Sequence, residues 1–339
     1  MTDSSTQWDL FGSPPEVGER VEPAPVREEV VRVAARLPKD LHLGTSSWSF
    51  PGWGGIVYSQ LYGVALLARR GLPAYARHPL LNSVNLDSTF YRAPSVEQLR
   101  RYAADVPVNF RFIAKAYVGL TAPPESSMAL RRGIEPVFLD AAFAQRAVVG
   151  PLVEGLGSRL GAVLFQFSPL GARYTRAPGT FVERLEAFLS ALPRGPVYAV
   201  ELRDPEILGP EYEAALRRVG AVHCSNVHSR MPPVDRQVRR AQAGPLLIRW
   251  MLQPGDDYQS AATRYAPFDR LRAPDKVNRE RIAGMIRNQY SSPAVRTAAG
   301  AADETPMSSE CDVYVVAANN AEGCAPLTLL ELAKTLVAN

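Results

Sequence analysis

Residues 196–205, Pro-Val-Tyr-Ala-Val-Glu-Leu-Arg-Asp-Pro, decide the fold. The first half, through Val200, is an apolar, β-branched and aromatic run of the length of a strand that is buried on both faces. The second half turns abruptly to Glu201, Arg203 and Asp204. Because the carboxyl ends of parallel strands open onto a shared crevice or barrel mouth, charges at such an end predict a functional site there.

The rest of the chain repeats this alternation of a buried strand and a helix. After Pro38, strand-like composition occurs at residues 41–47, 83–87, 108–115, 161–167, 197–202, 221–225, 245–250 and 312–318. Helical patterns occur at residues 64–77, 96–104, 137–156, 181–192, 211–219, 278–288 and 327–337. Eight strands and seven helices in single file predict an α/β protein, a single (β/α)8 TIM-like barrel, better than two open sheets. The sixth unit is the weakest, since residues 226–243 show no clear helical pattern.

The chain before the barrel has a different composition. Through about Pro25 it is rich in Ser, Pro, Gly and Glu with scarcely any periodicity, which predicts a disordered N-terminal tail. Val26 to Leu37 has the apolar spacing of an amphipathic surface helix that ends before Pro38. We therefore divide the chain into a tail with a surface helix, residues 1–37, and a barrel domain, residues 38–339.

Composition excludes several classes of protein. The chain has 339 residues, of which 46% are hydrophobic, as in a folded soluble domain. No apolar run approaches the roughly 20 residues that span a bilayer, and residues 1–10 are too polar for a signal peptide, so we expect a cytoplasmic protein with no membrane partner. The net charge of +4 is modest and predicts no strong direct nucleic-acid binding. Phosphate-binding loops and the serine-hydrolase motif are absent from the sequence.

Polar side chains stand at the carboxyl ends of all the predicted strands and form the candidate site. Polar groups at every strand end are what a pocket for a small polar or anionic ligand, such as a sugar or a phosphorylated compound, requires. Trp48 would offer that ligand an aromatic platform. The expected catalytic residues are Glu201, Asp87 and Lys115, and the expected ligand-binding residues are Trp48, Asn85, Gln166, Arg203, Arg249, Asn319 and Asn320.

Two interpretations of Glu201 stay open. Glu201 beside Asp87 would form a carboxylate pair for general acid/base chemistry, with Lys115 or Arg249 neutralising an anionic group. Glu201 and Arg203 also lie on the same face of an extended strand. In the second interpretation, Glu201 forms a buried ion pair with Arg203 or Arg249 that orders the barrel mouth.

No cofactor is predicted from the sequence. His223 and His228, with Glu201 and Asp204 nearby in the fold, offer a divalent metal site as an alternative, but their spacing follows no metal-binding pattern. We expect each histidine to be a hydrogen-bonded structural or surface residue, and we assign no metal ligands.

Six short motifs occur in order along the predicted barrel. They are Leu43-Gly-Thr-Ser-Ser-Trp48, Ser88-Thr-Phe-Tyr91, Phe110-Arg-Phe112 with Lys115, Leu164-Phe-Gln-Phe167, Val200-Glu-Leu-Arg203, and Asn319-Asn320 with Gly323. Together they resemble the successive motifs of the YecE-like family, also called DUF72, from about residue 41 to the end of the chain. The resemblance implies a single-domain TIM-like barrel and a family whose biochemical activity is not established.

The chain departs from that family pattern at four positions. Where the family usually reads Val-Glu-Ile-Asn before Ser-Thr-Phe-Tyr, this chain has Asn85 and Asp87, so one carboxylate is lost and another appears on the same side of the strand. The histidines that the family has after its third strand and on its seventh are Ala122 and Met251 here. The resemblance therefore implies that a mechanism using either imidazole as a proton carrier cannot operate unchanged.

The tail contains an apolar cluster, Gln7-Trp-Asp-Leu-Phe11. It resembles the Gln-Leu-Asp/Ser-Leu-Phe peptide by which many bacterial replication and repair proteins dock on the DNA sliding clamp, with Trp8 where Leu is usual. Leu10 and Phe11 would insert into an apolar pocket of the clamp, and Gln7 would add hydrogen bonds. The alternative function is therefore a non-enzymatic or DNA-maintenance accessory protein that docks to the clamp, although a five-residue pattern also arises by chance.

Overall fold

A closed parallel barrel forms the centre of the molecule. The computed structural model describes residues 20–93, 95–126, 129–130, 133–238, 244–291 and 312–338. Each strand pairs in parallel with its neighbours in chain order, and β1 pairs with β8 to close the barrel. The strands are β1 Leu41–Thr45, β2 Ser83–Leu86, β3 Arg111–Lys115, β4 Leu160–Gln166, β5 Tyr198–Glu201, β6 Val222–Val227, β7 Leu246–Trp250 and β8 Val313–Ala317. The predicted (β/α)8 architecture is thus confirmed, with the strand ends shifted by a few residues.

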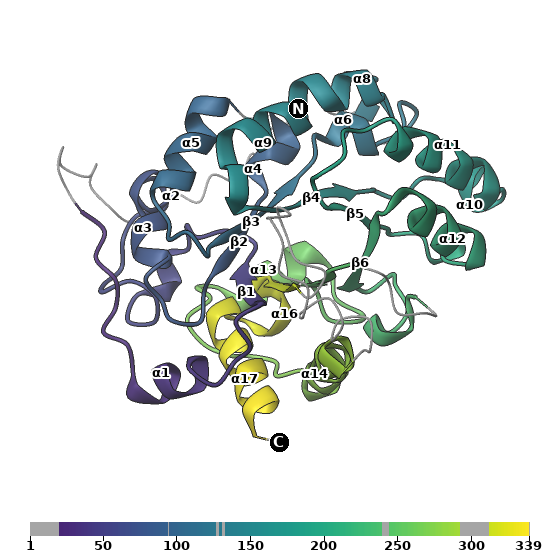
Figure 1. Cartoon of the computed structure of the whole chain (residues 1–339). Helices are drawn as coiled ribbons and strands as arrows, with labels where there is room; N and C mark the ends of the chain where they lie inside the picture. Colours follow the sequence, from purple (N-terminus) through teal and green to yellow (C-terminus); the bar gives the residue numbers. More distant parts are fainter. Residues whose placement is uncertain are drawn as a thin grey trace, which may run out of the picture.

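Helices surround the barrel on the outside (Figure 1). The longer ones are α1 Glu28–Ala34, α2 Val64–Arg70, α5 Val96–Ala104, α9 Gly150–Leu156, α11 Pro178–Ser190, α12 Pro210–Val219, α13 Tyr258–Tyr265, α14 Lys276–Ser291 and α17 Ala325–Val337. The short ones are α3 Leu72–Tyr75, α4 Ser88–Tyr91, α6 Val118–Thr121, α8 Ala141–Ala144, α10 Ala172–Thr175 and α16 Asn319–Glu322. Among the helices that the structure describes, none is long and apolar enough to cross a bilayer.

Two of the predicted helices are wrong in detail, and proline explains both. The helix predicted over residues 64–77 is divided at Gly71, and Pro73 lies in the first turn of α3, where its missing N–H costs nothing. The helix predicted over residues 137–156 begins only at α8, where the Asp140 side chain accepts a hydrogen bond from the Phe143 N–H at 2.9 Å. It then passes through a π-helical turn, Gln145–Val149, immediately before Pro151, which has no N–H for the helical ladder.

The segment between β6 and β7 and the N-terminal part of the chain also differ in part from the predicted structure. Between β6 and β7 the described residues form one 3₁₀ turn, Val234–Arg236, and residues 239–243 lie outside the description. The surface helix α1 is shorter than predicted, and an ion pair of 2.7 Å between Glu29 and Lys334 joins it to α17. The disorder predicted for the tail through about Pro25 is wrong for residues 20–25, because the Ala24 N–H donates a hydrogen bond of 2.9 Å to the Val57 carbonyl; residues 1–19 lie outside the described residues.

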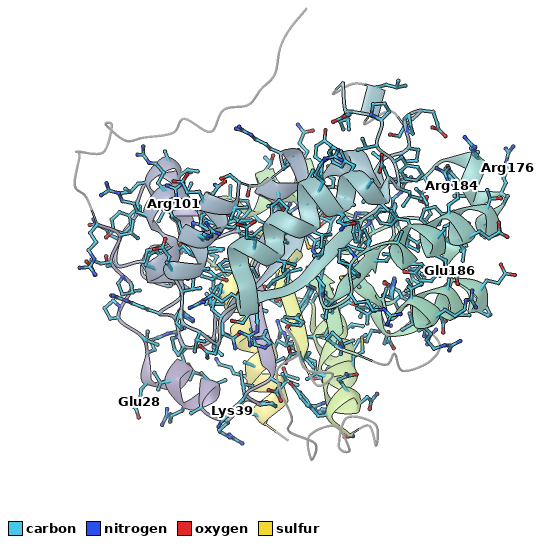
Figure 2. All side chains as sticks on the ribbon, turned by 45° about the horizontal axis from the view of Figure 1, so that its top comes forward. Glu28, Lys39, Arg101, Arg176, Arg184 and Glu186 are labelled. Atoms are coloured by element: carbon cyan, nitrogen blue, oxygen red, sulfur yellow. The ribbon has the colours of Figure 1, made fainter. Side chains whose placement is uncertain are left out.

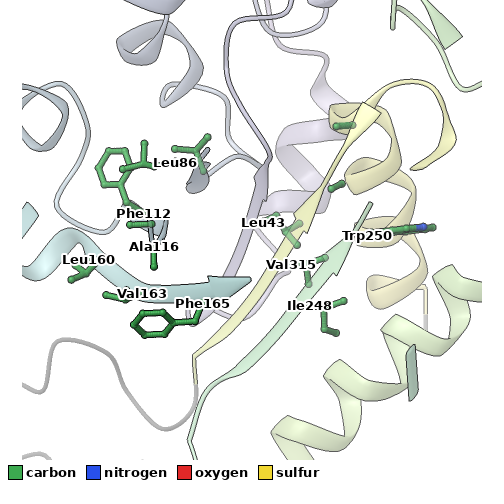
Figure 3. Close-up of a cluster of buried hydrophobic side chains, with 14 of the residues drawn as sticks. Leu43, Leu86, Phe112, Ala116, Leu160, Val163, Phe165, Ile248, Trp250 and Val315 are labelled. Atoms are coloured by element: carbon green, nitrogen blue, oxygen red, sulfur yellow. The ribbon is translucent and has the colours of Figure 1, made fainter. Parts of the chain in front are cut away.

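The main apolar core lies between the barrel and its helices. Figure 3 shows Phe112, Val163, Phe165 and Val315 among the side chains of this buried cluster, and each is no more than 1% exposed. Each strand contacts the helices with one face and the barrel interior with the other, so it carries apolar side chains on both faces. This is why the strands occur as continuous apolar runs in the sequence. This core fixes the strand register and so fixes which side chains reach the mouth.

One tyrosine of β8 fills much of the barrel interior. Tyr314 is fully buried, its ring stacks on His42 with centroids 4.9 Å apart, and its hydroxyl donates a hydrogen bond of 2.9 Å to Asp312. Small residues of β4 make room for it: a Cβ on Gly161 would lie only 3.0 Å from the Tyr314 ring, and Ala162 belongs to the same interior cluster. The interior is therefore a packed core and not a channel.

The loop after β1 packs closely against the loop after β7. Gly52 is buried, and a Cβ at this position would overlap the carbonyl group of Pro267. We expect Gly52→Ala to lower the free energy of unfolding by about 1–3 kcal/mol, because neither backbone can give way easily. Urea denaturation would measure the change.

Gly284→Ala is the matched control for this prediction. Gly284 lies within α14, and a Cβ there would have no atom within 4 Å. That variant should be more stable than the wild type by about 0.5–1 kcal/mol, because Ala favours the helix over Gly. Equal effects of the two substitutions would rule out the close approach of the two loops.

Candidate functional site

Six of the predicted site residues meet in one cluster at the carboxyl ends of the strands. They come from β2, β3, β4, β5 and β7, within two residues of the last residue of each strand, where alternate side chains point into the barrel mouth. Each is joined to another member by an ion pair or a hydrogen bond. The members of this mouth cluster are Asp87, Lys115, Gln166, Glu201, Arg203 and Arg249.

Glu201 is the anchor of the mouth cluster. Its side chain is 0% exposed, one carboxylate oxygen pairs with Arg203, and the other accepts a hydrogen bond of 2.5 Å from Arg249. Arg203 and Arg249 are themselves buried. Of the two interpretations of Glu201, the geometry therefore favours the buried ion pair, and it joins Glu201 to both arginines.

The electrostatics of the pair agree with its geometry. Burial by itself raises the pKa of Glu201, but the charges of Arg203 and Arg249 outweigh it and lower the pKa to about 2. Burial likewise opposes the charge on Arg249, yet Glu201 and Asp87 raise the pKa of its guanidinium above the usual value. Glu201 therefore stays ionised at neutral pH and has no proton to donate as a general acid.

Lys115 and Asp87 form the more accessible half of the mouth cluster. The Lys115 ammonium lies 3.1 Å from the Asp87 carboxylate, with side chains 9% and 38% exposed. Asn85 donates a hydrogen bond of 2.8 Å to the same carboxylate oxygen. The ammonium also lies over the Phe90 ring, 4.1 Å from its centroid. Burial is the main influence on Lys115 and lowers its pKa, with Asp87 acting in the opposite direction.

Arg249 connects the two halves. One guanidinium nitrogen contacts Glu201 and also donates to the Gln166 side chain at 3.2 Å, and the other lies 4.0 Å from the Asp87 carboxylate. The cluster thus holds three cationic and two carboxylate side chains, which leaves an excess of one positive charge among mostly buried side chains, where the effective dielectric is low.

Three other predicted ligand residues are directed elsewhere. The Trp48 indole N–H donates to the Leu67 carbonyl at 3.0 Å, and the residue is only 7% exposed, so this ring offers no open platform. The Asn319 side-chain oxygen accepts from the Ala325 N–H at 2.8 Å, at the start of α17. Asn320 lies on the rim and donates to the Tyr258 carbonyl at 3.4 Å.

Two aromatic residues near the mouth lie outside the strands: Tyr258 is the first residue of α13, and His228 directly follows β6. Tyr258 is 44% exposed, but burial is the largest influence on its hydroxyl and raises its pKa, and the charges of Arg203 and Arg249 act on it as well. The His228 ring lies 6.0 Å from the Tyr258 ring. The sequence contains no local signal for this pair, because the two residues follow different strands and approach each other only when β6 pairs with β7.

The histidines do not form a metal site in the described part of the chain. His223 is fully buried between the Tyr212 hydroxyl at 2.9 Å and the Gln237 side-chain oxygen at 3.2 Å. Burial lowers the pKa of both His223 and His228 to about 4, so both rings are neutral at pH 7. No three His, Cys, Asp or Glu side chains come close enough to hold an ion among the residues with described positions.

The two positions where the family resemblance leads us to expect histidine lie in apolar surroundings here. Ala122 is 2% exposed and packs in a small cluster with Phe90 and Val118. Met251 is 5% exposed and packs in a cluster with Tyr265. The tail residues Gln7, Leu10 and Phe11 lie outside the described residues, so clamp docking stays a prediction.

Comparison with known proteins places the chain in a family. The model of the family described as "Protein of unknown function DUF72" matches residues 42–339. No curated protein matches. A DUF72 family protein from Thermotoga maritima is similar in structure with a TM-score of 0.56 and 20% identity, covering 87% of this chain and 98% of its own. A DUF72 family protein from Enterococcus faecalis has a TM-score of 0.53 and 20% identity, covering 87% of this chain and 95% of its own. At this identity the structures establish the fold alone, whereas the family model spans most of the chain, and the chain therefore belongs to the DUF72 family.

Proposed function

We propose that the barrel mouth binds a small ligand with an anionic group, a phosphate or a carboxylate, and acts on it by acid/base chemistry. The observation that carries this proposal is the mouth cluster itself, in which three cations face two carboxylates. Cations held in a recess of low dielectric can bind an anion against competition from water. The preformed contacts reduce the entropy that the protein loses on binding.

The two carboxylates take different roles in this proposal. Glu201, with a pKa lowered to about 2, keeps Arg203 and Arg249 in place and takes no part in proton transfer. Asp87 and Lys115 are more accessible, and their contact of 3.1 Å is suitable for moving a proton between them or to a bound ligand. This division replaces the sequence-based hypothesis of an acid/base pair made of Asp87 and Glu201.

Phosphate should stabilise the folded protein by binding at the mouth. At ten times its dissociation constant, phosphate would add roughly 1.4 kcal/mol to the free energy of unfolding, which is about 2 °C in melting temperature for a chain of this size. Differential scanning fluorimetry at constant ionic strength measures the shift. We expect it in the wild type and expect less than half of it in Lys115→Ala.

Lys39→Ala is the matched control, because Lys39 precedes β1 at the opposite end of the barrel and is exposed (Figure 2). This variant should keep the full phosphate shift. Equal shifts in all three proteins would indicate a general salt effect and would count against an anion site in the mouth.

A further inference from the structure

We propose that Lys115 is an amine nucleophile that forms a Schiff base with the carbonyl group of a small anionic aldehyde or ketone bound in the barrel mouth. This inference rests on the proposed function, because it needs the same cations to hold the anionic end of the ligand. It adds a covalent step and a substrate class, and neither follows from anion binding alone.

The position of Lys115 supports a chemical role over a structural one. It is the last residue of β3, at the carboxyl end where barrel enzymes carry their reactive groups. Its ammonium has one carboxylate contact, Asp87 at 3.1 Å, and lies over the Phe90 ring. Arg203 and Arg249, by contrast, are both paired to the fully buried Glu201. Lys115 is thus the one cation of the mouth cluster that Glu201 does not hold in an ion pair.

The surroundings of Lys115 favour the free amine that a nucleophile requires. Two conditions activate a lysine: removal from water beside apolar groups, and the presence of another cation. Both are met, since Phe90 covers one side of the ammonium and the charge of Arg249 acts on it, and burial lowers its pKa.

The proposed step balances without an added oxidant or reductant. The Lys115 ammonium gives one proton to Asp87 and becomes a neutral amine. Its nitrogen lone pair forms a bond to the carbonyl carbon while the C=O π electrons move to oxygen, and proton transfer from nitrogen to this oxygen gives a carbinolamine. Asp87 then returns its proton to the hydroxyl group, which leaves as water as the C=N bond forms. The products are a protonated Schiff base and one water molecule.

The geometry also limits the size of the ligand. Lys115 and Arg249 lie 3.1 Å and 4.0 Å from the same Asp87 oxygen, so a molecule only a few atoms long reaches from the amine to the guanidinium. The ligand would therefore carry its carbonyl close to its anionic group. Short 2-oxo acids, with a ketone beside a carboxylate, and phosphorylated aldehydes of three or four carbons, with an aldehyde a few bonds from a phosphate, are the two classes of this size.

The test is reductive trapping on the full chain. The protein is incubated separately with pyruvate, glyceraldehyde 3-phosphate and uncharged acetone, each with sodium cyanoborohydride, and is then digested and mapped by mass spectrometry. The mapping is simple because the chain has only four lysines: Lys39, Lys115, Lys276 and Lys334. We expect one of the two anionic probes to label Lys115 at least tenfold faster than each of the other lysines, and acetone to show no preference for Lys115.

Two variants provide the controls. Lys115→Arg keeps the positive charge but is not trapped as a Schiff base, so the adduct should be lost, whereas Lys39→Arg should leave the labelling of Lys115 unchanged. Inorganic phosphate at a concentration that saturates the thermal shift should slow the labelling of Lys115 at least fivefold. The peptide map of the wild-type protein gives the labelling rate of each lysine separately. The comparison of rates therefore does not depend on whether Lys115→Arg folds well.

The outcomes separate this inference from the proposed function. Labelling of Lys115 that is no faster than labelling of Lys39 with both anionic probes overturns the Schiff base. If phosphate still stabilises the wild type more than Lys115→Ala, the proposed anion site is supported although the Schiff base is not. If phosphate does not raise the melting temperature of the wild type, the proposed anion site is contradicted. Rapid labelling of Lys115 by acetone as well would show a reactive lysine without anion recognition, which also overturns the inference as stated.

Discussion

Glu201→Gln is expected to lower the free energy of unfolding by about 3–5 kcal/mol, the loss typical of breaking a buried ion pair by removing one partner. The substitution keeps the shape of the side chain but leaves Arg203 and Arg249, both buried, without a counter-charge. In addition, the new amide group would turn N–H donors toward guanidinium N–H donors. Urea denaturation followed by circular dichroism measures the change.

The control is Glu206→Gln, which removes an exposed carboxylate five residues further along the chain. This variant should stay within about 0.5 kcal/mol of the wild type. Adding Arg249→Gln to Glu201→Gln should recover part of the loss, because one uncompensated buried charge is then removed. A loss below about 1 kcal/mol for Glu201→Gln would contradict the anchoring role and return Glu201 to the candidates for catalysis.

Acid should destabilise the fold well before the carboxylates are protonated. Burial lowers the pKa of His78, His223 and His228 from 6.5 to about 4. As the pH falls from 6.5 to 4, the unfolded chain therefore binds protons that the folded chain does not, and stability falls with pH across this window. For the fully buried His223 the difference between pH 7 and pH 4.5 is roughly 2–3 kcal/mol. Equilibrium urea denaturation at the two pH values would reveal it.

His223→Gln isolates the contribution of one ring, since an amide keeps hydrogen-bonding groups near Tyr212 and Gln237 without titrating. The variant should be less stable at pH 7 but should lose roughly 2–3 kcal/mol less than the wild type on acidification. The raised pKa of Glu322, caused mainly by burial, acts in the opposite sense and is common to both proteins. An unchanged pH dependence in the variant would show that His223 is protonated as readily in the folded state as in the unfolded chain.

The fold was predictable because its signals are local and repeated. Each strand is a short apolar run, and the alternation with helices leaves few other topologies. Helix interiors were less predictable. The π-helical turn before Pro151 occurs inside a stretch of continuous apolar periodicity, so the pattern alone gives no reason to expect it.

The site was predictable where strand geometry determines the direction of a side chain. Lys115 and Glu201 end their strands, and alternation along the strand directs both into the mouth. Trp48 and Asn319 lie just beyond strand ends, where alternation no longer holds, and hydrogen bonds to Leu67 and Ala325 direct them elsewhere. Tyr258 begins α13, eight residues beyond the end of β7, where strand alternation predicts no direction for its side chain.

Tyr314 has a consequence for turnover. Its ring fills the barrel beneath the mouth cluster, and the neighbouring interior residues Leu164, Ala199 and Leu247 are no more than 2% exposed. The barrel interior is thus closed beneath the mouth cluster. Under the proposed function, a product would have to leave by the route along which its substrate entered. Product and substrate would occupy the same site, and product inhibition should be competitive with respect to substrate.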